Sequence, residues 1–396
     1  MFNDLSNRVK AIKPSPTLAV TALASQLKAQ GRDVVGLGAG EPDFDTPEHI
    51  KQAAIEAIQK GQTKYTAVDG TSELKQAIIN KFASENGFQY EAGQILVSSG
   101  GKQSFYNLCQ ALLNKGDEVI IPAPYWVSYP DMVILAEGTP VIMQTSIDEQ
   151  FKISAEALSQ AITANTRMLV INSPSNPTGV AYSASELKAI AEVLLAHPDI
   201  LVVTDDMYEH IIWNQEGFVN ILNVCPELYG RCMVLNGVSK AYSMTGWRIG
   251  YAAGPADIIK AMKKIQSQST SNPCSISQAA AVAALSGDQS CIQTMLKAFK
   301  ERHDYVLKSL NAIPHISCMP SDGTFYSFPN IQSFIDARSD LNNDVDVANL
   351  LLDKVGVAII PGSAFGSPGY MRLSFATSME NLQKALSRID QVFSEK

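Results

Sequence analysis

The chain has 396 residues, of which 46% are apolar, and a formal net charge of −8 at pH 7. This length exceeds the size at which one hydrophobic core stays efficient, so we expect two packed domains. Acidic and basic residues are interspersed and no basic stripe or basic amphipathic arm occurs, which argues against nucleic acid or a membrane surface as the main partner.

The N-terminus lacks the charged start and apolar core of a signal peptide, and no apolar run reaches membrane-spanning length. We therefore expect a soluble, cytoplasmic protein. The six cysteines are scattered and form no C-x-x-C pair. This pattern predicts no metal site and suits reduced, mostly buried thiols.

A proline-rich stretch around Lys13-Pro14-Ser15-Pro16 precedes a short predicted helix and a predicted strand over residues 34–37. We expect this N-terminal segment to join a smaller domain. Beyond it, apolar runs that suit buried strands alternate with helical stretches. The alternation predicts an α/β domain with a mostly parallel seven-stranded sheet. Its strands are expected at residues 94–97, 118–121, 141–143, 168–171, 200–204, 233–235 and 249–253.

Helices are clearest at residues 184–196, which follow a capping-box pattern at Ser183, and over residues 276–310. The C-terminal part changes character and predicts a small α+β domain. Short strands are expected there near residues 323–328, 357–360 and 370–375, among amphipathic helices at 345–353 and 381–392. We assign residues 48–290 to a large domain, and residues 1–47 with 291–396 to the small domain.

A glycine pair follows the first strand of the large domain, in Ser98-Ser99-Gly100-Gly101-Lys102-Gln103. This segment opens a helix, so unpaired backbone N–H groups and the positive end of the helix dipole can receive a phosphate. Glycine permits the close approach. The alternative is that Gly100 and Gly101 only form a turn.

Two further strand-end loops carry candidate ligand groups. Trp126 follows a Pro-Ala-Pro segment, and its ring could stack on a planar cofactor or simply belong to the core. Asn176 lies in a loop that Pro174 and Pro177 stiffen. Its amide could bridge a cofactor hydroxyl and a substrate carboxylate, although an Asn-Pro turn needs no function.

Asp205 and Tyr208 come directly after an apolar strand. Ligands of open α/β sheets bind at the carboxyl ends of the strands. A carboxylate there could hold the ring nitrogen of a pyridine cofactor protonated and strengthen the ring as an electron acceptor. We assign that role to Asp205 and expect Tyr208 to donate to the ring hydroxyl, while a helix N-cap remains the alternative for Asp205.

The segment from Ser239 to Arg248 follows the apolar run at residues 232–235. A strand that runs into a turn of small residues can aim Lys240 at a bound carbonyl, while Arg248 holds an anion nearby. Lysines become nucleophilic when burial or a neighbouring cation lowers their pKa, and Schiff-base formation with pyridoxal 5'-phosphate is one use of such a group. Ordinary surface charges are the alternative.

Arg372 lies at the centre of the alternating strand predicted at residues 370–375. A charge on a half-buried strand needs a partner, and a guanidinium fork suits the α-carboxylate of an amino acid. A structural salt bridge is the alternative.

Together these residues resemble the class I and II aminotransferases, the fold-type I pyridoxal phosphate enzymes. The resemblance runs from about Asn7 to Val392. It implies a large domain that binds pyridoxal phosphate, a smaller α+β domain, and a homodimer with shared active sites. The motifs that carry it are residues 38–44, Lys64-Tyr65, residues 173–179, 205–208 and 239–248, and Arg372.

Within that family the chain is most similar to bacterial aspartate aminotransferases of the compact branch, some of which also accept prephenate. The resemblance implies that Lys13, Thr17 and Lys102 bind the distal carboxylate of the substrate. Another branch uses an arginine from the neighbouring subunit, and no arginine occurs between Arg248 and Arg302, where it would be expected.

The resemblance also implies roles for residues whose type alone says little. Gly40 offers its backbone to the substrate carboxylate, and Tyr65 reaches the cofactor phosphate of the partner subunit. Many relatives place a phosphate-binding serine at the position of Gly237, so Ser239 is the candidate to replace that contact.

We therefore expect an aminotransferase that moves the amino group of L-aspartate, or of a related amino acid, to a 2-oxo acid such as 2-oxoglutarate by a ping-pong mechanism. Lys240 would anchor the cofactor and carry the proton. The alternatives are a pyridoxal-phosphate lyase acting on sulfur amino acids, an aminotransferase for aromatic or apolar amino acids, and a non-catalytic ligand sensor on the same fold.

Overall fold

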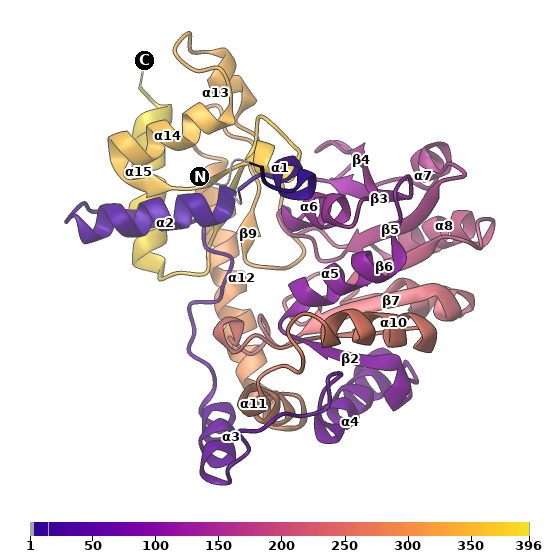
Figure 1. Ribbon diagram of the computed structural model, residues 1–396. Coiled ribbons are helices and arrows are strands. Elements are labelled where there is room, and N and C mark those ends of the chain that lie inside the picture. Colours follow the sequence, from indigo (N-terminus) through magenta and orange to yellow (C-terminus); the bar gives the residue numbers. More distant parts are fainter. Residues whose placement is uncertain (1–3, 15, 396) are drawn as a thin grey trace.

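The computed structural model describes residues 4–14 and 16–395. A large sheet with its helices lies beside a smaller group of C-terminal elements, and the long helix α12 runs between them (Figure 1). The large sheet has seven strands in the order β2-β8-β7-β6-β5-β3-β4. Its strands are β2 Ile95–Ser98, β3 Glu118–Ala123, β4 Thr139–Gln144, β5 Thr166–Asn172, β6 Leu201–Asp205, β7 Cys232–Gly237 and β8 Gly250–Ala253.

Strand direction in this sheet confirms the predicted fold class. Neighbours from β7 to β4 pair in parallel, whereas β8 runs antiparallel to both β2 and β7. The connection from β7 to β8 therefore needs no crossover helix. It is the loop that carries Lys240.

Burial on both faces explains why these strands are apolar throughout. Successive side chains alternate between faces, so Leu169 and Ile171 pack into one core while Val170 packs into the other. Helices α3 Glu48–Gln59, α4 Ser72–Lys81, α8 Ala184–Leu195 and α11 Ser275–Ser286 contribute to the first core. Helices α5 Gly101–Leu112, α6 Ser128–Leu135 and α10 Ala256–Ser267 contribute to the second.

Local signals explain several helix boundaries. The predicted capping box of α8 is present, with Ser183 and Glu186 each accepting the other's backbone N–H. Helix α4 continues into a π-type turn, η1 Phe82–Asn86, which ends at Gly87 in the left-handed region. The remaining helices of this domain are short, namely α7 Ala155–Ala161 and α9 Ile221–Val224, with 3-10 turns η2 Ala92–Gln94, η3 Pro226–Arg231 and η4 Thr245–Trp247.

The single helix expected over residues 276–310 is wrong. It is divided into α11 and α12 Ser290–Leu310. Gly287 follows α11 with an extended backbone, and a side chain there would meet the carbonyl oxygen of Ala283 at 2.4 Å. Asp288 then accepts the backbone N–H of Ser290 at 3.0 Å, which favours a new helix start.

Outside the large sheet, the chain forms two small sheets. β1 Val35–Gly36 pairs in parallel with β10 Val357–Ala358, which joins the N-terminal segment to the C-terminal part. β11 Ile360–Pro361, β12 Met371–Ser374 and β9 Tyr326–Ser327 form an antiparallel sheet. The strand expected over residues 357–360 is thus split at Ile359, because the chain changes its pairing partner there.

Helices α2 Pro16–Ala29, α13 Gln332–Asp336, α14 Asp344–Val355 and α15 Met379–Phe393 accompany these sheets, with α1 Asn7–Ala11 and the turn η5 Gly362–Phe365. Helix α12 contributes Ile292 to the core of the large sheet and Phe299 to the C-terminal core. The division at residues 48 and 290 stays a prediction. None of the helices in the described part of the chain has the length and apolar character to cross a membrane.

Candidate active site

A cavity of about 420 Å³ lies where β5, β6 and β7 end, and residues of the N-terminal and C-terminal segments complete its wall. It collects most of the residues that the sequence singled out. Those lining it are Thr17, Gly40, Gly101, Lys102, Trp126, Asn176, Asp205, Tyr208, Ser239, Lys240, Arg248 and Arg372. Side chains from distant motifs therefore share one space, as expected at the carboxyl ends of parallel strands.

Lys240 lies on the wall of this cavity, in the loop between β7 and β8. Its ammonium group donates to the carbonyl oxygen of Gly40. Burial and the nearby Arg372 and Arg248 lower the pKa of Lys240 to about 8, against the opposing charges of Glu41 and Asp205. A substantial fraction of the amine is thus uncharged near neutral pH, as a nucleophile or base requires.

Asp205 is the last residue of β6 and faces the same cavity. Its carboxylate accepts the hydroxyl of Tyr129 at 2.5 Å and the backbone N–H of Met207 at 3.3 Å. Burial raises the pKa of Asp205, although Tyr129, Met207 and the charge of Lys240 act in the opposite direction. A cation placed in the cavity beside this carboxylate would stabilise its ionised form.

Tyr208 has a partner that the sequence did not reveal. Its hydroxyl lies 3.0 Å from the hydroxyl of Tyr326, and both rings are buried. Burial and the neighbouring Tyr326 raise the pKa of Tyr208 well above its usual value, so the phenol stays protonated. It can therefore act as a hydrogen-bond donor.

One end of the cavity suits an anion. Gly100 caps the N-terminus of α5 with φ of 86°, and a Cβ there would lie 2.3 Å from Nη2 of Arg248. Arg248 itself is in the left-handed region, at φ of 56°, and donates to the carbonyl of Thr245 at 2.8 Å. Such backbone strain is often found at functional sites. The glycine turn lets a guanidinium and helix N–H groups approach one point.

Arg372 is buried on β12 without an ion-pair partner among the described residues. It donates to Oδ1 of Asn176 at 2.9 Å and to the carbonyl of Gly38 at 2.7 Å, and its Nε has no partner in the described part of the chain. The guanidinium also lies over the rings of Tyr326 and Phe365. These contacts orient the group but leave its charge uncompensated, which suits an incoming carboxylate.

Lys102 and Trp126 also line the cavity. The ammonium group of Lys102 lies 5.3 Å from the Trp126 ring centroid, and burial together with the charge of Arg248 lowers the pKa of Lys102. This lysine also borders a second cavity beside the first, which it shares with Arg248. A flat ring could stack on the exposed part of the Trp126 indole.

Lys13 and Tyr65 do not line the cavity. The backbone N–H and the charge of Lys13 act on Asp131, which borders the second cavity. Tyr65 is 92% exposed. Tyr65 is expected to serve the site of the partner subunit, and its role and that of Lys13 stay predictions.

Sequence reasoning missed Tyr129, Asn172 and Tyr326. Asn172 donates to the backbone carbonyl of Asp205 at 2.9 Å, across the register that pairs the two residues. The strand ends at residues 172 and 205 could have indicated that contact. Tyr129 and Tyr326 carry no such signal, since they lie 76 and 118 residues from their hydrogen-bond partners.

Gly237 shows why a glycine suits that position. A Cβ there would lie 3.0 Å from Cα of Gly250 and from the carbonyl oxygen of Ile249 on the neighbouring strand. A serine would be crowded unless β8 moved. Ser239 borders the cavity instead.

The donor set fits pyridoxal phosphate. A carboxylate, a phenol and an amine surround one part of the cavity, whereas Arg248 and the N-terminus of α5 face another. These groups match a pyridine nitrogen, a ring hydroxyl, an aldehyde and a phosphate. Arg372 is a further cation, suited to a second anionic molecule.

Comparison with known proteins agrees with this geometry. The family model described as aminotransferase class I and II matches residues 32–389. The aspartate/prephenate aminotransferase of Nitrosomonas europaea is 62% identical over 395 residues, which cover 98% of this chain and 100% of that protein. The aspartate aminotransferase of Geobacillus stearothermophilus is 50% identical over 385 residues, covering 97% of this chain and 98% of its own.

Solved structures of aspartate aminotransferases also match this chain closely in fold. The aspartate aminotransferase of Rhizobium meliloti superposes with a TM-score of 0.94 at 48% identity and covers 98% of both chains. That of Thermus thermophilus, solved with maleate, superposes with a TM-score of 0.93 at 44% identity, covering 99% of this chain and 100% of that one.

Proposed function

Because the chain belongs to the class I and II aminotransferases, we propose that it moves the amino group of L-aspartate, or of a related amino acid, to 2-oxoglutarate. Pyridoxal phosphate is the proposed cofactor. The observation that carries the proposal is the placement of Lys240, a lysine with a lowered pKa, in a cavity that Asp205 and Arg372 also line. Relatives named aspartate/prephenate aminotransferase support the substrate, and prephenate is a further acceptor to test.

Pyridoxal phosphate, when bound, supplies an aldehyde that condenses with amines and a pyridinium ring that accepts electrons from the substrate α-carbon. Asp205 would hold the ring nitrogen protonated, and Tyr208 would donate to the ring hydroxyl. Asn176 is a second candidate for that hydroxyl, while Trp126 would stack on the ring. The phosphate would lie between Arg248, Ser239 and the Gly100-Gly101 turn.

Lys240 has two tasks in this scheme. Its uncharged amine would hold the cofactor between turnovers. Once an amino acid has taken its place, the same amine would accept the proton from the substrate α-carbon and then donate it again. A pKa of about 8 suits both tasks, since the group can gain and lose a proton near neutral pH.

Arg372 would bind the substrate α-carboxylate, with Gly40 offering its backbone beside it. Asn176 and the carbonyl of Gly38 orient the guanidinium before substrate arrives. Preorganisation of this kind places the α-proton near Lys240 without further ordering.

Lys102 and Thr17 border the cavity and, with Lys13, are the proposed ligands of the distal carboxylate. The Thermus thermophilus relative was solved with maleate, which is also a dicarboxylate. That complex supports a site for two carboxylates in a relative of this fold.

A homodimer with shared active sites is part of the proposal. Tyr65 is almost fully exposed in the single chain, and Ile55 and Ile58 of α3 are exposed apolar residues, as a subunit interface would require. The six cysteines are free. This suits a reducing compartment, and we propose the cytoplasm.

The first experiment mixes the purified protein, reconstituted with pyridoxal phosphate, with L-aspartate alone and follows its visible and near-ultraviolet spectrum. We expect the absorption of the aldehyde form to disappear, that of the amine form to replace it, and 2-oxoglutarate to reverse the change. Release of pyruvate and ammonia from a sulfur amino acid without an acceptor, with no response to L-aspartate, would instead indicate a lyase. Failure to bind the cofactor would contradict the proposal.

A further inference from the structure

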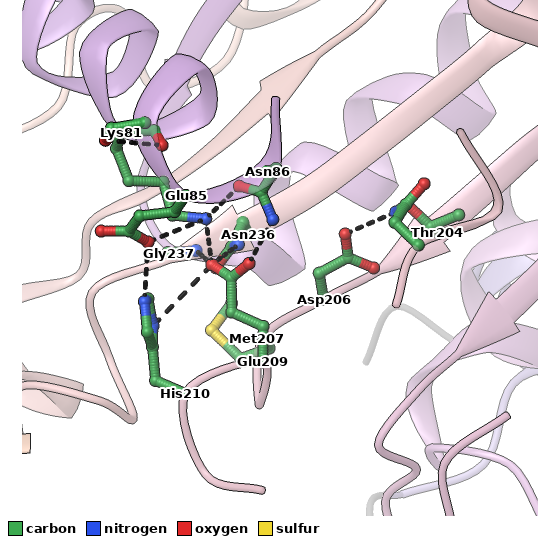
Figure 2. Close-up of polar contacts among 12 residues, drawn as sticks. Lys81, Glu85, Asn86, Thr204, Asp206, Met207, Glu209, His210, Asn236 and Gly237 are labelled. Atoms are coloured by element: carbon green, nitrogen blue, oxygen red, sulfur yellow. Dashed lines mark hydrogen bonds and ion pairs between the residues drawn. The ribbon is translucent and has the colours of Figure 1, made fainter. Parts of the chain in front are cut away.

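A buried ion pair lies behind the candidate active site and has no role in the proposed reaction. It joins Lys81, the last residue of α4, to Glu209, one residue after Tyr208 (Figure 2). The Lys81 side chain is 0% exposed and that of Glu209 is 4% exposed. Burying two charges is costly unless all their partners are in place.

The ammonium group of Lys81 is surrounded by three polar side chains. It contacts the Glu209 carboxylate, donates to Oδ1 of Asn86 at 2.7 Å and lies 3.5 Å from the Glu85 carboxylate. Glu85 is bonded in turn to Nε2 of His210 at 2.8 Å. The carboxylates of Glu85 and Glu209 with His210 are spaced as metal ligands are, but both carboxylates already pair with the Lys81 ammonium group.

The Glu209 carboxylate extends the network toward the active site. One oxygen accepts Nδ2 of Asn86 at 3.0 Å, and the other accepts Nδ2 of Asn236 at 2.6 Å. Asn236 lies near the end of β7, and its own Oδ1 accepts the backbone N–H of Gly237 at 2.7 Å. Lys240 lies three residues after Gly237 along the chain. Burial opposes ionisation, but Lys81, His210 and Asn86 outweigh it and hold the pKa of Glu209 below its usual value.

A second set of contacts ties the same loop to β7. The backbone N–H of Asp206 donates to the carbonyl of Leu235 at 2.9 Å, and the buried Asn220 donates to the Asp206 carboxylate at 2.7 Å. Met207 packs against Gly101 and Gly237, since a Cβ on these residues would lie 2.7 and 3.1 Å, respectively, from Cε of Met207. The loop thus has little freedom to move relative to β7.

We propose that Lys81 and Glu209 are positioning residues that hold the Asp205–Tyr208 segment and the Lys240 loop in fixed register, so that both meet the cofactor together. Lys81 anchors Glu209 from α4, and Glu209 holds Asn236. The inference rests on the proposed function, because the cofactor is what the two loops are positioned for.

If the Lys81–Glu209 pair served only the stability of the fold, apolar residues could replace it. Replacing a buried ion pair by apolar residues is often neutral or stabilising, so stability by itself does not require these charges. An apolar pair at positions 81 and 209 could recover stability, but it would leave Asn86 and Asn236 without their acceptor. The polar contacts are what an apolar pair cannot reproduce.

The test compares Lys81→Met, Glu209→Gln and Asn236→Ala with the wild type. Lys75→Met is the matched control, because Lys75 is also a buried lysine of α4, and its partner Asp69 is bonded to Lys263 rather than to either loop. Cofactor-free protein is prepared for each variant. The affinity for pyridoxal phosphate is then measured by titration, together with the pH dependence of its visible absorption and the thermal midpoint of the cofactor-free form.

We expect Lys81→Met and Asn236→Ala to weaken cofactor affinity by about tenfold or more, because small displacements of supporting groups have large effects at such sites. The pH midpoint of the visible absorption should also shift. Lys75→Met should lower the thermal midpoint while keeping both cofactor readouts. In the double variant Lys81→Met with Glu209→Met, the thermal midpoint should recover more than the affinity does.

Variants that melt earlier but bind pyridoxal phosphate as the wild type does, with an unchanged absorption profile, would overturn the positioning role. Full recovery of affinity in the double variant would overturn it too. If Lys81→Met does not fold, Asn236→Ala decides, since it removes one link of the network without changing a charge. A wild type that binds no cofactor would overturn the proposed function and this inference together.

Discussion

Lys81 and Lys240 hold their ammonium groups in opposite surroundings. Lys81 is enclosed by the carboxylates of Glu209 and Glu85 and the amide of Asn86. Lys240 faces a cavity, donates to a backbone carbonyl and has the cations Arg372 and Arg248 nearby.

The difference shows how one residue type serves two purposes. A buried lysine enclosed by carboxylate and amide partners acts as a fixed structural contact. A lysine placed among cations in a cavity loses its proton more readily and becomes a reagent. Burial alone therefore does not identify a catalytic lysine, whereas burial beside uncompensated positive charge does.

The largest effect is expected from Lys240→Ala. This change removes the cofactor anchor and the proton carrier at once, so turnover of L-aspartate with 2-oxoglutarate should fall by about 10³-fold or more. Bound pyridoxal phosphate should still be detectable after the protein is saturated with it. Steady-state rates measure the loss, and near-normal turnover would contradict the role of Lys240.

The two lysines should also differ in what they contribute to stability. Lys81→Met leaves Glu209 buried without its cation, so the free energy of unfolding should fall by about 3–5 kcal/mol. Lys240→Met removes a charge that lies among other cations and should cost less than about 1 kcal/mol. Urea unfolding of the cofactor-free proteins measures both. Equal losses would mean that Lys240 is also held by favourable charge contacts.

A pH experiment tests the lowered pKa of Lys240. The uncharged amine is the reactive form, so its fraction rises with pH and reaches one half at about 8 instead of near the ordinary 10.5. At pH 7 this pKa makes the amine roughly 300-fold more available than that of an ordinary lysine. The rate at which cofactor-free protein condenses with a small neutral aldehyde should follow that curve. A midpoint near the ordinary value would contradict the electrostatic interpretation.

Smaller and more selective effects are expected at the distal carboxylate. Lys102→Ala and Lys13→Ala should lower kcat/KM for L-aspartate by about tenfold, the scale of one hydrogen bond to a charged group, and leave an apolar amino acid less affected. Parallel assays with L-aspartate and L-leucine measure the selectivity. Equal losses for both substrates would argue against a distal-carboxylate role.

The smallest effect is expected from Tyr326→Phe, which keeps the ring beneath Arg372 and removes the hydroxyl that contacts Tyr208. One hydrogen bond is worth about 1 kcal/mol, so kcat/KM should fall roughly fivefold. Tyr326→Leu is the matched variant that also removes the ring, and it should have the larger effect. No change in either would mean that Tyr326 only fills space.

Sequence and structure agree best where a signal is local. Strand ends carry Asn176, Asp205 and Lys240, and the apolar runs before these residues show where each strand stops. The capping box at Ser183 likewise predicts the start of α8 correctly. The split between α11 and α12 was missed, although residues 286–290 are polar or glycine and interrupt the apolar pattern where α11 ends.

The α/β class, the strand-end positions of the candidate site residues and, through ordered motifs, the resemblance to a family can all be read from the chain alone. These depend on short-range periodicity and on residue types a few positions apart. The residues that support the site become visible only in the folded molecule. Tyr129 reaches Asp205, Tyr326 reaches Tyr208, and Lys81 reaches Glu209 through contacts between distant segments. No local pattern predicts such pairs, because chain packing and not sequence spacing brings them together.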